Sequence, residues 1–344
     1  MQFRTIPGTD VQVSEFAFGS GDNAGGLIYA DTAQQIRLVE AALASGINYF
    51  DCSPDYGKGL AEANLGRILR DMKVQDEVFL VTKVEIMPED FPRIPEKVEQ
   101  SISDSLLRLR RDHVDLVMLH NPCQPRNDTR LRTWTPLTPE QFLHEVLPAL
   151  QKARAAGKTR LLGVAEERAD GSCVEQVLAS RQFSLMNVWF NLANPSAVRP
   201  VEGLPGNEQY FGFFDSAQRY DVGVAVIRPL AGGALTKAIG DLGADGRHPV
   251  SGGWYRQHPE ELEPERARGR RFGFLERASQ TLVEAAYKYI LSFHQVTSII
   301  GGFSEVAHIS DALAASDGPP LSPGDLAEIA GVHDAGFVMA GQDE

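Results

Sequence analysis

Four side chains that could take part in proton transfer stand where hydrophobic segments of this chain end. Asp51 ends "INYFD", Lys83 ends "VFLVTK" and His120 ends "VDLVMLH". Tyr56 follows Asp51 after a short turn that contains proline. A carboxylate, a phenol, an amine and an imidazole that converge on one place suit the transfer of a proton to or from an oxygen atom.

The phenol of Tyr56 is the expected proton carrier. A free tyrosine has a pKa of about 10, and a neighbouring ammonium group favours the phenolate. We therefore expect Lys83 to lower the pKa of Tyr56 and Asp51 to keep Lys83 charged and oriented. His120 can hydrogen-bond a substrate carbonyl. No side chain donates hydride, so carbonyl chemistry here needs a redox cofactor, commonly a nicotinamide dinucleotide.

The four residues converge only if the hydrophobic segments are strands of one parallel sheet. Eight short apolar segments alternate with helical patterns, and most are continuously apolar, as strands buried on both faces are. They are "SEFAFG", "INYFDC", "VFLVTKV", "VDLVMLH", "TRLLGVA", "LMNVWFN", "VAVIRP" and "TSIIGG". Eight right-handed units predict a closed α/β barrel of the (β/α)8 type, whose strand ends form one mouth; a doubly wound open sheet is the alternative.

The intervening helices are predicted from apolar residues at steps of three and four. They are "DTAQQIRLVEAALASG", "GLAEANLGRILRD", "PEKVEQSISDSLLRLRR", "TPEQFLHEVLPALQKARAAG" and "LVEAAYKYILSFH". Asp31 and Thr32 can begin the first helix, and Gly46 and Gly157 can end two of them. A hairpin is expected around "IPGTDV", and residues 240–274 are expected to form a long irregular loop after the seventh strand. We expect one domain over residues 1–344.

Composition limits the possible partners. The 344 residues carry a formal net charge of -13, which disfavours nucleic acid and membrane surfaces as partners and favours a small molecule. No signal peptide or membrane-spanning segment is recognised, so we expect a cytoplasmic protein. Cys52, Cys123 and Cys173 contain no CxxC pair and are expected to be free thiols. No metal site is expected, and the oligomeric state stays open.

The sequence resembles the aldo-keto reductase family. "FRTIPGTDVQVSEFAFGSG", "GINYFDCSPDYGKGLAEANLGRIL", "VFLVTKV" and "VDLVMLHNP" resemble its hairpin with first strand, its Asp and Tyr signature, its lysine strand and its histidine strand. "LLGVAEE", "FNLANPSA", "RPLAGGALT" and "IIGG" match later strands more loosely. The resemblance implies a dinucleotide bound in extended form without a Rossmann unit. It also implies that Tyr56 is the general acid or base, supported by Asp51, Lys83 and His120.

The same resemblance implies a set of cofactor contacts, several of which differ from the usual family pattern. Ala165 and Glu166 stand where a Ser and Asn pair is usual, Asn187 replaces the commoner Gln, and Ile227 stands where an aromatic residue often stacks on nicotinamide. Glu166 could accept a hydrogen bond from the carboxamide and could pair with Arg228. The expected contacts are Gly19, Ser20, Asp51, Glu166, Asn187, Arg228, Leu230, Gly232, Gly302, Phe303, Ser304 and His308.

NADP is the expected cofactor on family grounds, and NAD is possible. Basic residues are often found near the positions of Gly302 and His308 in members that use NADP, and here the backbone NH groups after the eighth strand could bind a phosphate instead. The arginines between Arg266 and Arg271 could add positive charge, or could balance "EELEPE" as a solvated run.

The expected function is therefore NAD(P)-dependent oxidoreduction of an aldehyde, a ketone or a sugar-like alcohol. One alternative is an NAD-dependent aldose or sugar-alcohol dehydrogenase. Another is a dinucleotide-binding redox sensor or scaffold with weak catalysis. Selectivity for the substrate should come from the mouth loops, especially the "WTPLTPEQ" region and Trp254.

Overall fold

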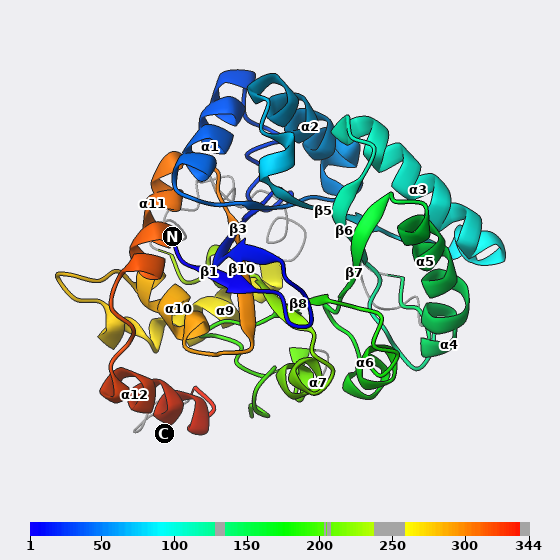
Figure 1. Cartoon of the computed structure of the whole chain (residues 1–344). Coiled ribbons are helices and arrows are strands. Elements are labelled where there is room, and N and C mark those ends of the chain that lie inside the picture. Colours follow the sequence, from blue (N-terminus) through cyan, green and yellow to red (C-terminus); the bar gives the residue numbers. More distant parts are fainter. Residues whose placement is uncertain (128–134, 203, 205–207, 237–258, 338–344) are drawn as a thin grey trace.

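A closed barrel of eight parallel strands forms the centre of the computed structural model (Figure 1). The structure describes residues 1–127, 135–202, 204, 208–236 and 259–337. The strands follow each other around the barrel in chain order, and the last pairs with the first. They are β3 (Phe16–Gly19), β4 (Tyr49–Asp51), β5 (Phe79–Val84), β6 (Val114–Leu119), β7 (Thr159–Ala165), β8 (Leu185–Trp189), β9 (Gly223–Ile227) and β10 (Val296–Gly302). All eight predicted strands are confirmed, and the open-sheet alternative is wrong.

Helices surround the barrel, as the ring of coiled ribbons in Figure 1 shows. Those of the first half are α1 (Thr32–Ala44), α2 (Leu60–Met72), α3 (Ile94–Leu109), α4 (Pro139–Gln141) and α5 (Leu147–Ala155). Those of the second half are α6 (Gly171–Leu178), α7 (Phe213–Arg219), α9 (Pro259–Arg270), α10 (Leu282–Leu291), α11 (Val306–Asp317) and α12 (Pro323–Asp334). The helix predicted over residues 138–157 is interrupted by a π-helical turn at Phe142–Val146.

The predicted helix ends are confirmed. Asp31 accepts a hydrogen bond from the backbone NH of Gln34 at 2.8 Å, so it caps α1. Gly46 and Gly157 follow helix ends with φ of +85° and +74°, a conformation that costs glycine little because it has no Cβ.

Two hydrophobic layers hold the barrel together. The larger layer packs the outward faces of the strands against the helices, and the smaller one fills the barrel interior. The predicted hairpin forms from β1 (Phe3–Thr5) and β2 (Gln12–Ser14). Its Ile6 and Val13 are fully buried in the interior layer with Tyr49 and Leu116, so the hairpin closes the end of the barrel opposite the mouth (Figure 1).

The segment expected to be an irregular loop contains a helix. Residues 259–270 form α9, so the prediction is wrong for this part, and residues 237–258, including Trp254, lie outside the described residues. The helix has little apolar periodicity, which is why the pattern missed it. Its first turn carries Glu260 and Glu261 and its last turn carries Arg268 and Arg270, an order that complements the helix dipole.

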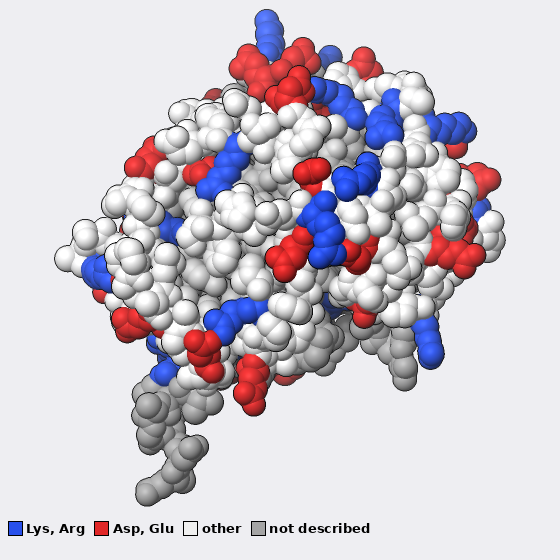
Figure 2. Space-filling model, turned by 60° about the horizontal axis from the view of Figure 1, so that its bottom comes forward, with Lys and Arg blue, Asp and Glu red and all other residues white. Residues whose placement is uncertain are grey.

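The described residues contain no helix that is long and apolar enough to cross a membrane, and the cytoplasmic location stays a prediction. All three cysteines are buried and free. On the face shown in Figure 2, acidic and basic residues are interspersed, and the basic ones form no broad patch.

Candidate active site

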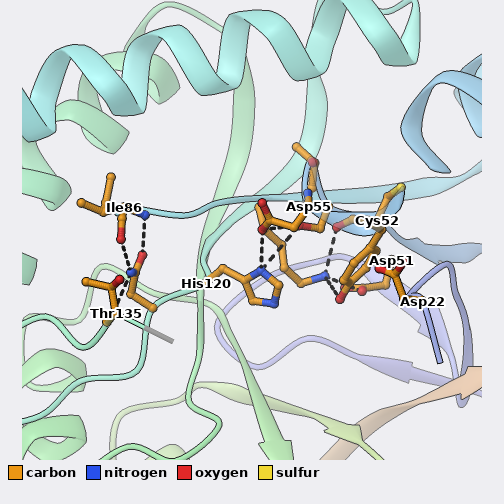
Figure 3. Close-up of polar contacts among 12 residues, drawn as sticks. Asp22, Asp51, Cys52, Asp55, Ile86, His120 and Thr135 are labelled. Carbon is orange, nitrogen blue, oxygen red and sulfur yellow. Dashed lines mark hydrogen bonds and ion pairs between the residues drawn. The ribbon is translucent and has the colours of Figure 1, made fainter. Parts of the chain in front are cut away.

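The structure brings the four predicted proton-transfer residues together at the carboxyl ends of three neighbouring strands, and Figure 3 shows two of them, Asp51 and His120. Asp51 is the last residue of β4, Lys83 lies in β5, and His120 directly follows β6. Tyr56 begins a short 3₁₀ turn after β4 and is half-buried. Parallel strands in register place their last residues at one rim, so the barrel itself makes this cluster.

Lys83 is the centre of the cluster. Its Nζ donates to Asp51 Oδ1 at 2.5 Å, to the carbonyl oxygen of Cys52 at 3.0 Å and to the Tyr56 hydroxyl at 3.3 Å. The Lys83 and Asp51 side chains are 1% and 3% exposed. Three acceptors match the three protons of an ammonium group, so the Lys83 charge is held at a fixed distance from the phenol.

The expected lowering of the Tyr56 pKa is wrong. Burial raises the pKa of Tyr56 well above its usual value, and the nearby Asp51 adds to this effect. Lys83 does not reverse the shift because the carboxylate of Asp51 offsets its charge at 2.5 Å. The phenol is therefore protonated at neutral pH, which is the form that donates a proton.

His120 packs against the Tyr56 ring. The two rings are 6.0 Å apart between centroids and nearly perpendicular, at 81°. His120 Nδ1 is 3.3 Å from Asp55 Oδ2 and 3.5 Å from Ser53 Oγ, as the dashed lines in Figure 3 show for the Asp55 contact. Burial lowers the pKa of His120, and Asp55 opposes this shift. The sequence analysis did not predict Asp55 as a site residue, although Asp55 directly precedes Tyr56 in the chain and so had to lie near the site.

Several buried polar atoms at the mouth have no hydrogen-bond partner among the described residues. They include Ser20 Oγ after β3, Asp51 Oδ2, Glu166 Oε1 after β7 and Asn187 Oδ1 in β8. Buried polar atoms in folded proteins are nearly always paired, so such a group of unpaired atoms indicates a ligand site. All four belong to residues predicted to contact a cofactor, so these residues fit a polar ligand.

Glu166 does not pair with Arg228, contrary to expectation. Its Oε2 accepts from the backbone NH of Cys123 at 3.2 Å, and it is fully buried. Arg228 instead forms ion pairs with Glu167 at 3.8 Å and Glu265 at 4.0 Å, and its guanidinium lies 3.9 Å from the Trp189 ring centroid. A guanidinium that stacks on an aromatic face and has two other carboxylates nearby is not available to neutralise Glu166.

Burial without a cation raises the pKa of Glu166 to about 8. Through Glu166, the folded state therefore binds one more proton than the unfolded state between about pH 5 and pH 8, and the stabilisation that this proton gives is lost as the pH rises.

We expect a Glu166→Gln variant to lack this pH dependence. Relative to the native chain, its free energy of unfolding should rise by about 3 kcal/mol between pH 5 and pH 8, because each pKa unit corresponds to about 1.4 kcal/mol. Urea unfolding across this range measures the difference. Glu140→Gln, at an exposed position, is the control. Parallel stability curves for the native chain and Glu166→Gln would show that Glu166 ionises normally.

The other predicted cofactor residues lie on the same rim or just beyond it. Gly19 ends β3, while Arg228, Leu230 and Gly232 follow β9. Gly302 ends β10 and is exposed. Phe303 is buried, and its ring packs against the ring of Phe18 with 5.8 Å between the centroids. Only the backbone of Phe303 is therefore available to a ligand.

Ser304 lies just before α11 and His308 lies in its first turn. Ser304 Oγ is 3.4 Å from His308 Nδ1. The predicted contacts therefore extend from the mouth toward α11.

A cavity of about 520 Å³, which none of the predicted cofactor contacts lines, was not predicted. It is bounded by the segment after β9 with Thr236, by α9 with Arg266 and Arg270, and by Asp311 of α11. Glu263 balances both arginines, at 3.7 Å from Arg266 and 2.7 Å from Arg270. The predicted balance of charge between the arginines and "EELEPE" is thus present. Both arginines nevertheless line the cavity.

The sequence profile of the Aldo/keto reductase family matches residues 15–334. The chain belongs to the aldo/keto reductase family. It is therefore an NAD(P)-dependent oxidoreductase that acts on small molecules, as the resemblance implied.

Among relatives in this family, L-galactose dehydrogenase of Arabidopsis thaliana is 26% identical over 326 residues, which are 92% of this chain and 88% of the relative. D-threo-aldose 1-dehydrogenase of a Pseudomonas species is 32% identical in an alignment of 151 residues that covers 37% of this chain and 42% of that protein. The holo form of an aldo-keto reductase from Bacillus halodurans has the same fold, with a TM-score of 0.70, 21% identity and 99% coverage of both chains.

Proposed function

We propose that this aldo/keto reductase interconverts a carbonyl compound and its alcohol with Tyr56 as general acid and base. The observation that carries the proposal is the contact of a buried ammonium group with both a carboxylate and the phenol, through Lys83, Asp51 and Tyr56. We also propose that residues 1–344 act as one barrel domain.

In the reductive direction the Tyr56 hydroxyl donates its proton to the carbonyl oxygen. Lys83 stabilises the phenolate that this transfer leaves, because its Nζ already donates to the hydroxyl at 3.3 Å. His120, whose ring packs against that of Tyr56, orients the substrate oxygen. In the oxidative direction the phenolate takes the hydroxyl proton back.

A bound nicotinamide dinucleotide would supply or accept the hydride. Ser20, Asn187 and Glu166 would hold its polar groups with their buried unpaired atoms. When it is protonated, Glu166 has one donor and one acceptor, as an amide side chain has, so it can serve a carboxamide where the family commonly has Asn. Leu230, Gly232 and the cavity beside α9 and α11 offer room for the rest of an extended dinucleotide.

We propose NADP as the cofactor, with NAD as the alternative. Arg266 and Arg270 at the cavity supply the positive charge that a phosphate needs, and Ser304 and His308 supply polar groups near the start of α11. Glu263 and Asp311 work against an anion at the same place. Equilibrium binding of NADPH and NADH, followed by the quenching of tryptophan fluorescence, separates the two.

An aldose or sugar-alcohol dehydrogenase is the second candidate, with NAD as its cofactor. It is favoured by the full-length similarity to a protein named L-galactose dehydrogenase. Comparing the rates of oxidation and reduction with each cofactor distinguishes this candidate from a carbonyl reductase.

The test of the proposed function is a panel of aldehydes, ketones, aldoses and sugar alcohols, assayed with both cofactors through the absorbance of reduced nicotinamide. Turnover of at least one class supports the proposal. Binding of the dinucleotide without turnover of any class would instead favour the redox sensor or scaffold.

A further inference from the structure

A pair of carboxyl groups lies behind the imidazole of the active site. Asp55 Oδ2 faces His120 Nδ1 at 3.3 Å and accepts from Ser53 Oγ at 3.2 Å. Glu85, which follows β5, is in hydrogen-bond contact with Asp55. Two carboxyl groups that form a hydrogen bond must share a proton, because two carboxylates offer only acceptors.

The proton of this pair resides on Glu85. Burial and the neighbouring Asp55 raise the pKa of Glu85 to about 8. Burial alone would raise the pKa of Asp55 as well, but the hydrogen bond to His120, the charge of that ring and the hydrogen bonds to Glu85 and Ser53 together outweigh burial and hold that pKa below the usual value. At neutral pH, Asp55 is therefore an acceptor for three neighbours, namely Ser53, Glu85 and the imidazole.

The charged and titratable groups around His120 come from β4, β5 and the segments that follow these strands. Among the described residues, Asp55 and Asp51 favour the imidazolium, Lys83 disfavours it, and the Tyr56 phenol is neutral. Lys97 and Asp90 act on Glu85 with opposite signs. Asp55 is the carboxylate in direct contact with the ring.

We infer that Asp55, with Glu85 behind it, is a positioning residue that keeps the proton of neutral His120 on Nδ1. The ring nitrogen whose partner is a carboxylate acceptor carries the proton, and the other nitrogen is then the acceptor. Nε2 of His120 therefore gains a proton only when the ring becomes imidazolium. The neutral ring suits a substrate hydroxyl that donates, and the imidazolium suits a carbonyl that accepts.

This inference rests on the proposed function for its catalytic meaning, but its test does not need turnover. Histidine labelled with ¹⁵N reports the tautomer and the titration of His120 in the intact chain. In the native protein, the neutral ring should be almost entirely the Nδ1–H form. A second inflection in the His120 shifts is expected near pH 8, where Glu85 ionises.

Asp55→Asn removes the charge and lets an amide NH2 face Nδ1. We expect a mixture of the two neutral tautomers and a His120 midpoint about one pH unit lower. Glu85→Gln should keep the Nδ1–H tautomer and abolish the inflection near pH 8. Asp112→Asn is the matched control, because Asp112 contacts His113 at 2.8 Å on the exposed surface, and it should change neither property of His120.

In an active preparation, Asp55→Asn should lower kcat/KM for alcohol oxidation about twofold, because about half of the neutral rings no longer offer Nε2 as an acceptor, and it should leave dinucleotide affinity unchanged. An Nε2–H tautomer in the native protein, or an unchanged His120 tautomer and midpoint in Asp55→Asn, would overturn the inference. If the tautomer shifts as expected while no carbonyl or alcohol is turned over, the positioning role stands and the proposed function fails.

Discussion

Tyr56→Phe is expected to reduce carbonyl turnover roughly a thousandfold, because the loss of a positioned general acid usually has an effect of this size. The phenyl ring keeps the shape that packs near His120 at 6.0 Å between centroids. What it loses is the hydroxyl that lies 3.3 Å from Lys83 Nζ. Single-turnover rates with saturating cofactor measure the change in the chemical step.

The affinity of Tyr56→Phe for the dinucleotide shows whether the variant loses only the proton donor or also the structure of the site. We expect it to be unchanged in Tyr56→Phe, while kcat falls. Tyr220→Phe is the matched control, since the Tyr220 hydroxyl donates to Glu175 far from the mouth, and this variant should keep full activity. A Tyr56→Phe enzyme that works at the native rate would show that another group donates the proton.

Lys83→Met is expected to lower both activity and stability. The activity should fall by a factor of about a hundred or more, because the phenolate loses its neighbouring cation. The free energy of unfolding should fall by about 3 to 5 kcal/mol, because the variant leaves the Asp51 carboxylate buried without its partner. Denaturant unfolding and steady-state rates measure the two effects.

Two further variants separate the charge from the packing. Lys83→Met combined with Asp51→Asn should recover part of the lost stability and none of the lost activity. Lys152→Met breaks an ion pair with Glu99 that is similar in length, 2.6 Å, but whose side chains are 69% and 41% exposed. It should cost at most about 1 kcal/mol. Equal losses from Lys83→Met and Lys152→Met would mean that the buried pair has no special role.

The barrel could be predicted because its strands are buried on both faces and are therefore almost continuously apolar. Continuously apolar strands indicate a parallel barrel, and the carboxyl ends of β4, β5 and β6 then lie at one rim. This is why the sequence predicts that Asp51, Lys83 and His120 meet. Helix α9 could not be predicted in this way because charge, with acids first and arginines last, organises it more than apolar periodicity does.

The electrostatics of the site could not be read from residue types alone. The sign of the Tyr56 pKa shift depends on how closely Asp51 offsets Lys83, and a sequence does not contain that distance. The partner of Arg228 depends on α9 and on the Trp189 ring, which come from segments far apart in the chain. Asp55 was visible in the sequence, but its role became apparent only through its contact with His120.

The hairpin that packs Ile6 and Val13 into the barrel interior has a consequence for kinetics. Since the hairpin seals one end and side chains fill the interior, both ligands must enter and leave through the mouth. Whichever binds deeper has to arrive first and depart last. Product inhibition should therefore reveal a compulsory order of binding and release, whereas a random order would mean that neither ligand blocks the other at the mouth.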